Sequence, residues 1–155
     1  MAGRLATMHG MAQDLVSLSY KSRVRLADPG GDLVRIMQTS RVRNARLGIT
    51  GILLYNGFHF VQTIEGPREC CKDLFERISE DPRHGDIVAF GLREIGQRQF
   101  PDWSMRLISR EELRAIVPDL ALVDLREPED IEDLHRIICG KLGAECPPPP
   151  ASRPS

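Results

Sequence analysis

Gln62 is the residue whose type and position first suggest chemistry. It lies in the segment 57–66, GFHFVQTIEG, where β-branched and aromatic residues between two glycines predict a strand. Alternate residues of a strand share a face, so Gln62 is expected between Phe60 and Ile64, on an apolar face that begins at Phe58. A buried carboxamide without partners costs about 2–7 kcal/mol. Either backbone or water satisfies Gln62, or a polar ligand lies over this face.

Other polar side chains also continue apolar rows. Tyr20 ends the apolar row of a strand predicted at 14–20, and Ser40 and Asn44 extend the apolar stripe of a helix predicted at 33–43. Each has an ordinary explanation when it is taken alone. A tyrosine at a strand end can reach water with its hydroxyl, and an asparagine can cap a helix because it tolerates positive φ.

Charged side chains gather around the end of a second helix, predicted at 68–80. Arg77 and Asp81 are four residues apart on one side of it, and His84 follows in the next turn. The ordinary explanations are a surface ion pair and an exposed turn histidine. Together with the polar groups above, these residues would line a space between two helices and a sheet, where a flat ligand with polar edges would satisfy several of them.

No set of catalytic residues stands out. The chain has no Ser/His/Asp or Cys/His arrangement, no HExxH, no P-loop and no GxGxxG, so we do not expect an enzyme. The cysteines lack zinc-site spacing, so no metal site is expected and all four are predicted to be reduced thiols. A formal net charge of −1 gives no field that would attract nucleic acid. Without an apolar run long enough for a membrane span or a signal peptide, the chain is expected to be cytoplasmic.

These residues are placed by a regular succession of elements. Strands are predicted at 14–20, 47–55, 58–65, 86–95 and 103–109, and helices at 33–43, 68–80, 111–117 and 127–140. Segment 21–25 is expected to be a basic loop and 28–31 a turn. Asn56-Gly57 predicts a two-residue hairpin that pairs the second and third strands antiparallel.

Two further expectations concern side-chain direction. Trp103, Met105 and Leu107 should share one face of the fifth strand. The helix at 127–140 should direct a stripe of four apolar side chains inward: Ile131, Leu134, Ile137 and Ile138.

The order β-α-β-β-α-β predicts an α+β fold of the ferredoxin-like type, with both main helices on one face of the sheet, a fifth strand and a small C-terminal helical cap. The expected organisation is a mobile segment at 1–13, the main domain at 14–109, the cap at 110–144 and a disordered proline-rich tail at 145–155. An uncovered sheet face would favour a homodimer.

Five short motifs, in order and at matching spacings, resemble the BLUF domain, a blue-light sensor that uses a flavin. They are LVSLSY at 15–20, NARLGITG at 44–51, FVQTIEG at 60–66, DPRH at 81–84 and FPDWSM at 100–105. The resemblance covers about residues 14–109, which makes this part the flavin-binding domain. The whole chain is most similar to the short, stand-alone members without an effector domain.

The resemblance implies a role for each matching residue. Tyr20 would be the light-dependent donor of an electron and a proton, Gln62 would bridge Tyr20 and the N5/O4 edge of the flavin, and Asn44 would bind the pyrimidine end of the ring. The remaining cofactor contacts would come from Ile36, Ser40, Phe60, Arg77, Asp81, His84 and Met105. Trp103 and Met105 occupy the positions whose placement near Gln62 is debated in the family, and both are candidates for signalling.

The function implied is therefore a photoreceptor that binds FAD, rearranges the hydrogen bonds of Gln62 in light and signals to an unidentified partner protein. Two alternatives stay open at this point. One is a ferredoxin-like ligand-binding module without photochemistry. The other is an acylphosphatase-like hydrolase that uses the basic loop at 21–25, although the glycine- and arginine-rich phosphate loop of those enzymes is missing.

Overall fold

The structure is a computed structural model that describes residues 14–117 and 124–142. The predicted mobile segment at 1–13 and the predicted tail at 145–155 lie outside the described residues. The elements are β1 (Leu15–Val24), α2 (Pro29–Leu47), β2 (Thr50–Tyr55), β3 (His59–Pro67), α3 (Arg68–Ser79), β4 (His84–Glu94), β5 (Arg106–Ile108), α4 (Arg110–Ile116) and α5 (Pro128–Leu142).

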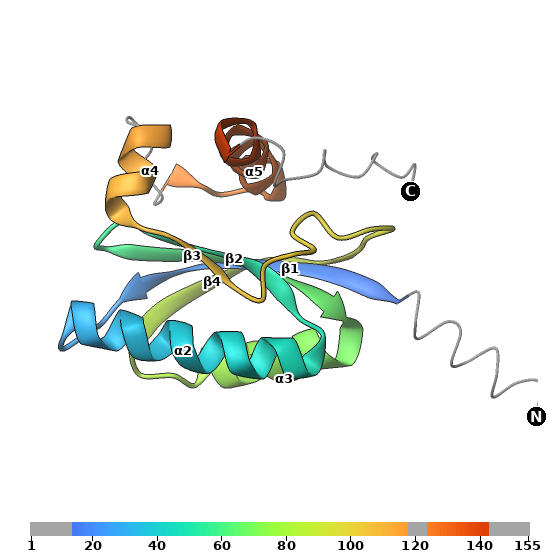
Figure 1. Cartoon of the computed structure of the whole chain (residues 1–155), viewed down its shortest axis with the longest axis horizontal. Coiled ribbons are helices and arrows are strands. Elements are labelled where there is room, and N and C mark those ends of the chain that lie inside the picture. Colours follow the sequence, from blue (N-terminus) through green and yellow to red (C-terminus); the bar gives the residue numbers. More distant parts are fainter. Residues whose placement is uncertain (1–13, 118–123, 143–155) are drawn as a thin grey trace, which may run out of the picture.

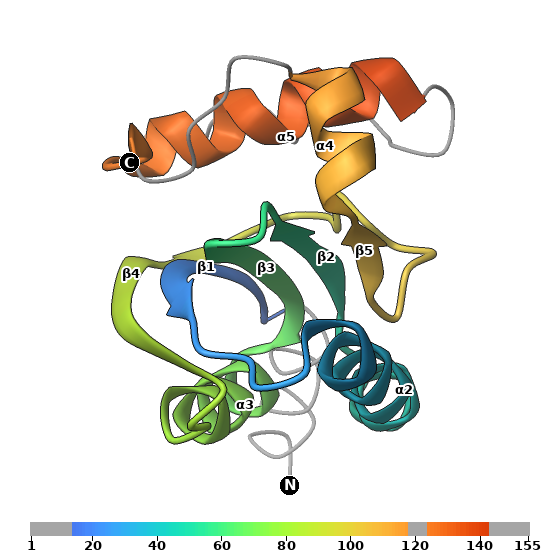
Figure 2. The same ribbon diagram turned by 90° about the vertical axis from the view of Figure 1, so that its left-hand side faces the viewer.

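One five-stranded sheet in the order β4-β1-β3-β2-β5 forms the middle layer. All pairs are antiparallel except β2 and β5, which are parallel. Helices α2 and α3 lie on one face of the sheet, and α4 and α5 lie on the other (Figure 1; Figure 2). The expected ferredoxin-like sandwich with a fifth strand and a helical cap is confirmed.

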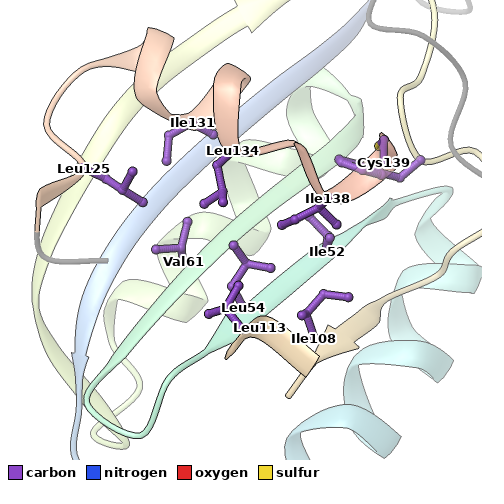
Figure 3. Close-up of a cluster of buried hydrophobic side chains, with 11 residues drawn as sticks. Ile52, Leu54, Val61, Ile108, Leu113, Leu125, Ile131, Leu134, Ile138 and Cys139 are labelled. Atoms are coloured by element: carbon purple, nitrogen blue, oxygen red, sulfur yellow. The ribbon is translucent and has the colours of Figure 1, made fainter. Parts of the chain in front are cut away.

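Each face of the sheet carries its own apolar core, because the side chains of β1, β2 and β3 alternate between the two faces. Val16, Leu18 and Ile64 pack toward α2 and α3. Val61 and Ile52 pack toward the cap, against a stripe of α5 (Figure 3). Since the cap covers the second face, an uncovered face gives no reason to expect a dimer.

Two predicted boundaries at the start of the domain are wrong. Strand β1 continues to Val24, so Lys21 and Arg23 of the expected basic loop are part of the sheet, and only Arg25 follows it. Helix α2 begins at Pro29, because proline fits the first helical turn, where its missing N–H is not needed. The helix ends at Leu47 and is capped by Gly48, which adopts φ 69° and donates its N–H to the Asn44 carbonyl. Asn44 therefore lies inside the helix and is no cap.

The hairpin between β2 and β3 is confirmed, but its turn is shifted by one residue. The last pair is Tyr55 with Phe60, and Gly57, at φ 96°, occupies the turn with Phe58. Asn56 closes the turn with its side chain, which accepts hydrogen bonds from the N–H groups of Phe58 and His59. Phe58 is consequently 64% exposed and does not share the apolar face of Phe60.

The fifth strand is shorter than predicted, and Trp103 and Met105 do not share a face. Because β5 spans only Arg106–Ile108, both residues precede it and strand alternation does not apply to them. Met105 is buried in the core of α2 and α3. Trp103 packs on the cap side, stacked on Phe100 with ring centroids 5.7 Å apart.

Helix α5 buries a different stripe from the one expected. Its inward residues are Ile131, Leu134, His135, Ile138 and Cys139, and Ile137 is 45% exposed. The prediction of reduced thiols holds for Cys70 and Cys71 and is wrong for Cys139, which is disulfide-bonded. Within the described ranges, the helices are too short or too polar to span a membrane.

The correction in α5 can be tested on two neighbouring isoleucines. Ile138→Ala should lower the free energy of unfolding by about 2–5 kcal/mol, because it empties a fully buried site. Ile137→Ala, the matched control, should change it by about 0.5 kcal/mol or less. Urea denaturation of both variants measures the difference in the free energy of unfolding. Equal losses of stability would mean that Ile137 and Ile138 are equally buried, which would contradict this arrangement of α5.

Candidate functional site

The centre of the site is a hydrogen bond between two adjacent strands. The β1–β3 register pairs Tyr20 with Gln62, so both side chains leave the sheet on the face of α2 and α3. The Tyr20 hydroxyl donates to Gln62 Oε1 at 2.5 Å, and both residues are buried. On its other side, the carboxamide donates from Nε2 to Met105 Sδ at 3.5 Å. The thioether is a weak acceptor, so only one end of Gln62 is held firmly.

A cavity that is open to solvent lies over this pair between the sheet, α2 and α3. Eight of the predicted site residues line it: Tyr20, Ile36, Ser40, Phe60, Gln62, Arg77, Asp81 and His84. The structure therefore brings most of the predicted site residues together around one cavity.

Two predicted residues stand outside the lining. Met105 contacts the site through Gln62, whose Nε2 lies 3.5 Å from its Sδ. Asn44 is fully buried and donates from Nδ2 to the Ser104 carbonyl at 2.8 Å. Its Oδ1 has no hydrogen-bond partner among the residues that the structure describes. An unsatisfied buried acceptor is costly, so this oxygen is suited to a donor on a ligand.

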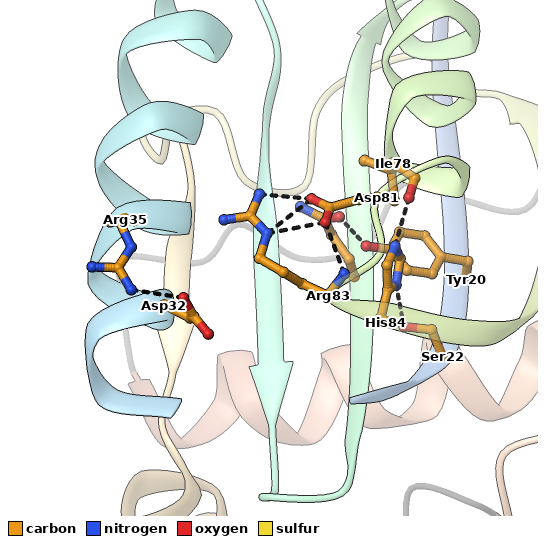
Figure 4. A network of polar contacts seen from close by, with 9 residues as sticks. Tyr20, Ser22, Asp32, Arg35, Ile78, Asp81, Arg83 and His84 are labelled. Atoms are coloured by element: carbon orange, nitrogen blue, oxygen red, sulfur yellow. Dashed lines mark hydrogen bonds and ion pairs between the residues drawn. The ribbon is translucent and has the colours of Figure 1, made fainter. Parts of the chain in front are cut away.

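His84 is not an exposed turn residue, which was its ordinary explanation from the sequence. It begins β4 and is buried, with Nε2 2.6 Å from the Ile78 carbonyl and Nδ1 2.6 Å from the Ser22 hydroxyl (Figure 4). A carbonyl only accepts, so Nε2 carries the hydrogen. If the ring is neutral, Nδ1 accepts from Ser22. Both nitrogens are engaged, and the ring lies 5.9 Å from that of Tyr20.

Asp81 pairs with Arg83 and not with Arg77, four residues before it. Arg83 holds the carboxylate through its Nε and NH2 groups, the latter at 2.6 Å (Figure 4). These hydrogen bonds lower the pKa of Asp81 below its usual value. Among the described residues, Arg77 makes no ion pair within 4.0 Å.

Sequence reasoning missed several lining residues: Thr39, Arg43, Leu53, Ile78 and Arg83. The arginines change the charge of the site, because Arg43, Arg77 and Arg83 face a single acidic residue in the lining. Burial, followed by the charges of the other two arginines, lowers the pKa of Arg43. Its Nε lacks a partner within the described part of the chain. This part of the lining is therefore suited to an anionic group such as phosphate. Arg43 lies three residues after Ser40, so helical spacing could have placed it on the same side of the helix. It was missed because the inward side was identified from its apolar residues, and Arg43 is charged.

Comparison with known proteins places this geometry in a family. The family model described as sensors of blue light using FAD, or BLUF, matches residues 15–106, more than half of the chain. The dark-state structure of BlrB, a BLUF protein, is 65% identical, covers 83% of this chain and 98% of its own, and superposes with a TM-score of 0.79. The photo-activated state of BlsA is 27% identical, covers 81% and 96%, and gives a TM-score of 0.71.

Curated relatives match the same part of the chain. The beta subunit of photoactivated adenylate cyclase from Euglena longa is 39% identical over 67% of this chain. The blue light- and temperature-regulated antirepressor BluF of Escherichia coli K12 is 34% identical over 68%. The match spans only 12% and 27% of the length of these two relatives.

The cavity residues fit a flavin. Apolar side chains of the lining, Ile36, Phe60 and Ile78, can pack against a ring, and the lining arginines carry charge opposite to that of a phosphate. Beside the lining, Asn44 Oδ1, which has no partner among the described residues, is suited to accept from a ring N–H. Within the described ranges, no group of three or more His, Cys, Asp or Glu side chains could hold a metal ion.

The state of the Tyr20 phenol gives a direct test of the site. Burial, and next the Asp81 carboxylate, raise the pKa of Tyr20 well above its ordinary value. Raising the pKa of an acid keeps it neutral, so the native apoprotein should retain the Tyr20 proton through about pH 11, above the ordinary tyrosine value near 10. Tyr20→Phe should therefore leave the native tyrosinate absorbance in this range unchanged. In denaturant, the variant should lose the signal of one of the two tyrosines. If the folded variant shows less tyrosinate absorbance near pH 11 than the folded wild type, the Tyr20 phenol is accessible and loses its proton there.

Proposed function

The chain belongs to the BLUF family of blue-light sensors that use a flavin, and we propose that the Tyr20–Gln62 pair carries its light response. The observation that supports this most is the 2.5 Å hydrogen bond from Tyr20 to Gln62 Oε1 at the wall of the cavity. A buried donor and a reorientable carboxamide, in contact with each other and with the cavity, are what such a response needs.

When bound, a flavin supplies absorption of blue light and an oxidising excited state. Tyr20 holds its proton firmly in the dark, because burial and Asp81 disfavour the phenolate. Loss of an electron from its ring would make the hydroxyl proton strongly acidic. Gln62 Oε1 is the acceptor to which Tyr20 donates, so the proton moves toward the carboxamide.

Gln62 can change its hydrogen bonds at low cost. Its Nε2 bond ends on the thioether of Met105, and a weak acceptor loses little when the carboxamide rotates or tautomerises. Once electron and proton have returned to Tyr20, the carboxamide is left with a different set of partners. A population shift in this network is the signal.

The cofactor we propose is FAD, held by the residues around the pair. Asn44 Oδ1 would accept from the pyrimidine end of the ring, and Ile36, Phe60 and Ser40 would contact the ring system. Contacts further out would come from Arg77, Asp81 and His84, together with Arg43 and Arg83. The excess of arginines in the cavity lining supports a cofactor that carries phosphate.

We also propose that the chain acts without catalytic turnover, as a sensor that signals to a partner protein. Met105 contacts Gln62 and is followed directly by β5 and α4. We therefore propose that the signal leaves Gln62 through Met105 and passes along β5 toward the cap. Trp103, stacked on Phe100 on the cap side, is a candidate to receive the signal there. The hydrolase alternative loses its basis, because the basic residues at 21–24 belong to β1.

An absorption spectrum tests the function. The purified full chain, reconstituted with FAD, should show a flavin band that shifts slightly to the red in blue light and returns in the dark. Gln62→Leu and Tyr20→Phe should bind FAD and lose the shift, because each removes one partner of the pair. A chain that stays colourless after reconstitution, or a shift that survives Gln62→Leu, would contradict the proposal.

Binding tests the position of the cofactor. Asn44→Ala should weaken FAD binding about tenfold, because a ring donor would lose its buried acceptor. Val42→Ala, on an exposed position of the same helix, is the control and should leave affinity unchanged. Flavin released from the protein purified as expressed should chromatograph as FAD. Equal affinity for the two variants would mean that the ring end does not reach Asn44.

A further inference from the structure

A second hydrogen-bonded pair lies directly behind the first, on the other face of the sheet. Ser19 and Thr63 are the neighbours of Tyr20 and Gln62 along β1 and β3, and the register pairs them with each other. Their hydroxyls are 2.8 Å apart, and both side chains are buried. The same two strands are therefore bridged by side chains on both faces at adjacent positions.

This rear pair is bonded to the helical cap. His135 of α5 is 3% exposed, and its Nε2 lies 2.9 Å from Thr63 Oγ1. Burial lowers the pKa of His135 to about 3, so the ring is neutral at physiological pH and only one of its nitrogens carries a hydrogen. The edge of the ring also meets Phe100, with centroids 5.1 Å apart.

The chain of three groups has two possible directions. Either hydroxyl of the Ser19–Thr63 pair can donate, and the role of His135 Nε2 depends on its tautomer. Reversing every bond keeps all three groups paired when the His135 ring also changes its tautomer, moving its proton from one ring nitrogen to the other. A hydrogen-bonded network with two satisfied arrangements can switch between them and so serve as a bistable element.

There is also room for such a change beside His135. The β1–β4 register shifts between Leu18 and Tyr20, and the β4 bulge contains Gly91 at φ 97°. Between this bulge and α5 lies a second cavity that is open to solvent. Ser19 and His135 both line it, so neither is enclosed by tight packing on that side.

We propose that Thr63 and His135 are positioning residues of the light response, which couple the Tyr20–Gln62 pair through β3 to the packing of α5. Gln62 and Thr63 share a peptide bond. A change in the Tyr20–Gln62 hydrogen bond on one face would therefore alter the spacing of β1 and β3 at the Ser19–Thr63 hydrogen bond on the other face. Helix α5 lies across this rear face (Figure 2). This inference rests on the proposed function.

The test uses the full chain reconstituted with FAD and two readouts. They are the rate of dark recovery of the red-shifted state and the light-minus-dark hydrogen exchange of residues 128–142. Thr63→Val removes the hydroxyl at nearly constant shape. The red shift should still form, because Tyr20 and Gln62 are intact. The exchange difference should fall at least about fivefold, a typical size for coupling between two sites, and the recovery rate should change.

Two further variants separate coupling from a merely structural role. Thr63→Ser keeps the hydroxyl and should restore both readouts. His135→Phe keeps an aromatic ring against Phe100 and should repeat the loss. The double variant Thr63→Val/His135→Phe should lose no more than either single variant, since all three remove the same bond. Ile137→Ala, on the exposed side of α5, is the control and should leave both readouts unchanged.

The outcomes distinguish the two proposals. A wild type without a red shift overturns the proposed function and this inference with it. A wild type with a red shift but no exchange difference in 128–142 overturns the inference alone, and so does a Thr63→Val variant that keeps the full difference. If Thr63→Val does not fold, His135→Phe and Thr63→Ser decide by the same criteria.

Discussion

The register between β1 and β3 is the constraint on which the rest of the site depends. It sets Tyr20 opposite Gln62 and Ser19 opposite Thr63, so one pair faces each layer. A slip of β3 by one residue would move every one of its side chains to the other face and could place Ile64 where Thr63 now meets Ser19. The apolar residues on both faces therefore fix the register, and the register fixes the polar pairs.

The two layers differ in whether their buried polar groups have hydrogen-bond partners. On the face of α2 and α3, an open cavity leaves Asn44 Oδ1 and Arg43 Nε without partners among the described residues, which is a surface prepared for a ligand. On the cap face, the buried polar groups satisfy one another, as Glu65 does by accepting the backbone N–H groups of Gln99 and Phe100. Burial is the main cause that raises the pKa of Glu65. The first layer is suited to binding, and the second to holding the loop before β5 and helix α5 in place.

The sequence was a good guide wherever periodicity determined the outcome. Alternation in β1 and β3 predicted the facing of Tyr20 and Gln62, and helical spacing predicted Ser40 and Asn44 on the inner side of α2. It failed where a long-range contact decided. Trp103 and Met105 separate because β5 pairs with β2 over only three residues, which no local pattern predicts. His135 looks like a surface residue of an amphipathic helix until its partner Thr63, 72 residues away, is known. Arg83 was overlooked because Asp81 has an equally good candidate partner at helical spacing.

The irregularity in β4 also bears on how the protein avoids aggregation. The sheet has two edges, β4 and β5, and a long flat edge can pair with the edge of another chain. Strand β5, with three residues, is too short to offer a continuous row of backbone groups. Strand β4, with eleven residues, would offer one, but its bulge interrupts the row and increases the local twist. The feature that leaves space beside His135 thus also protects the long edge of the sheet against intermolecular β-pairing.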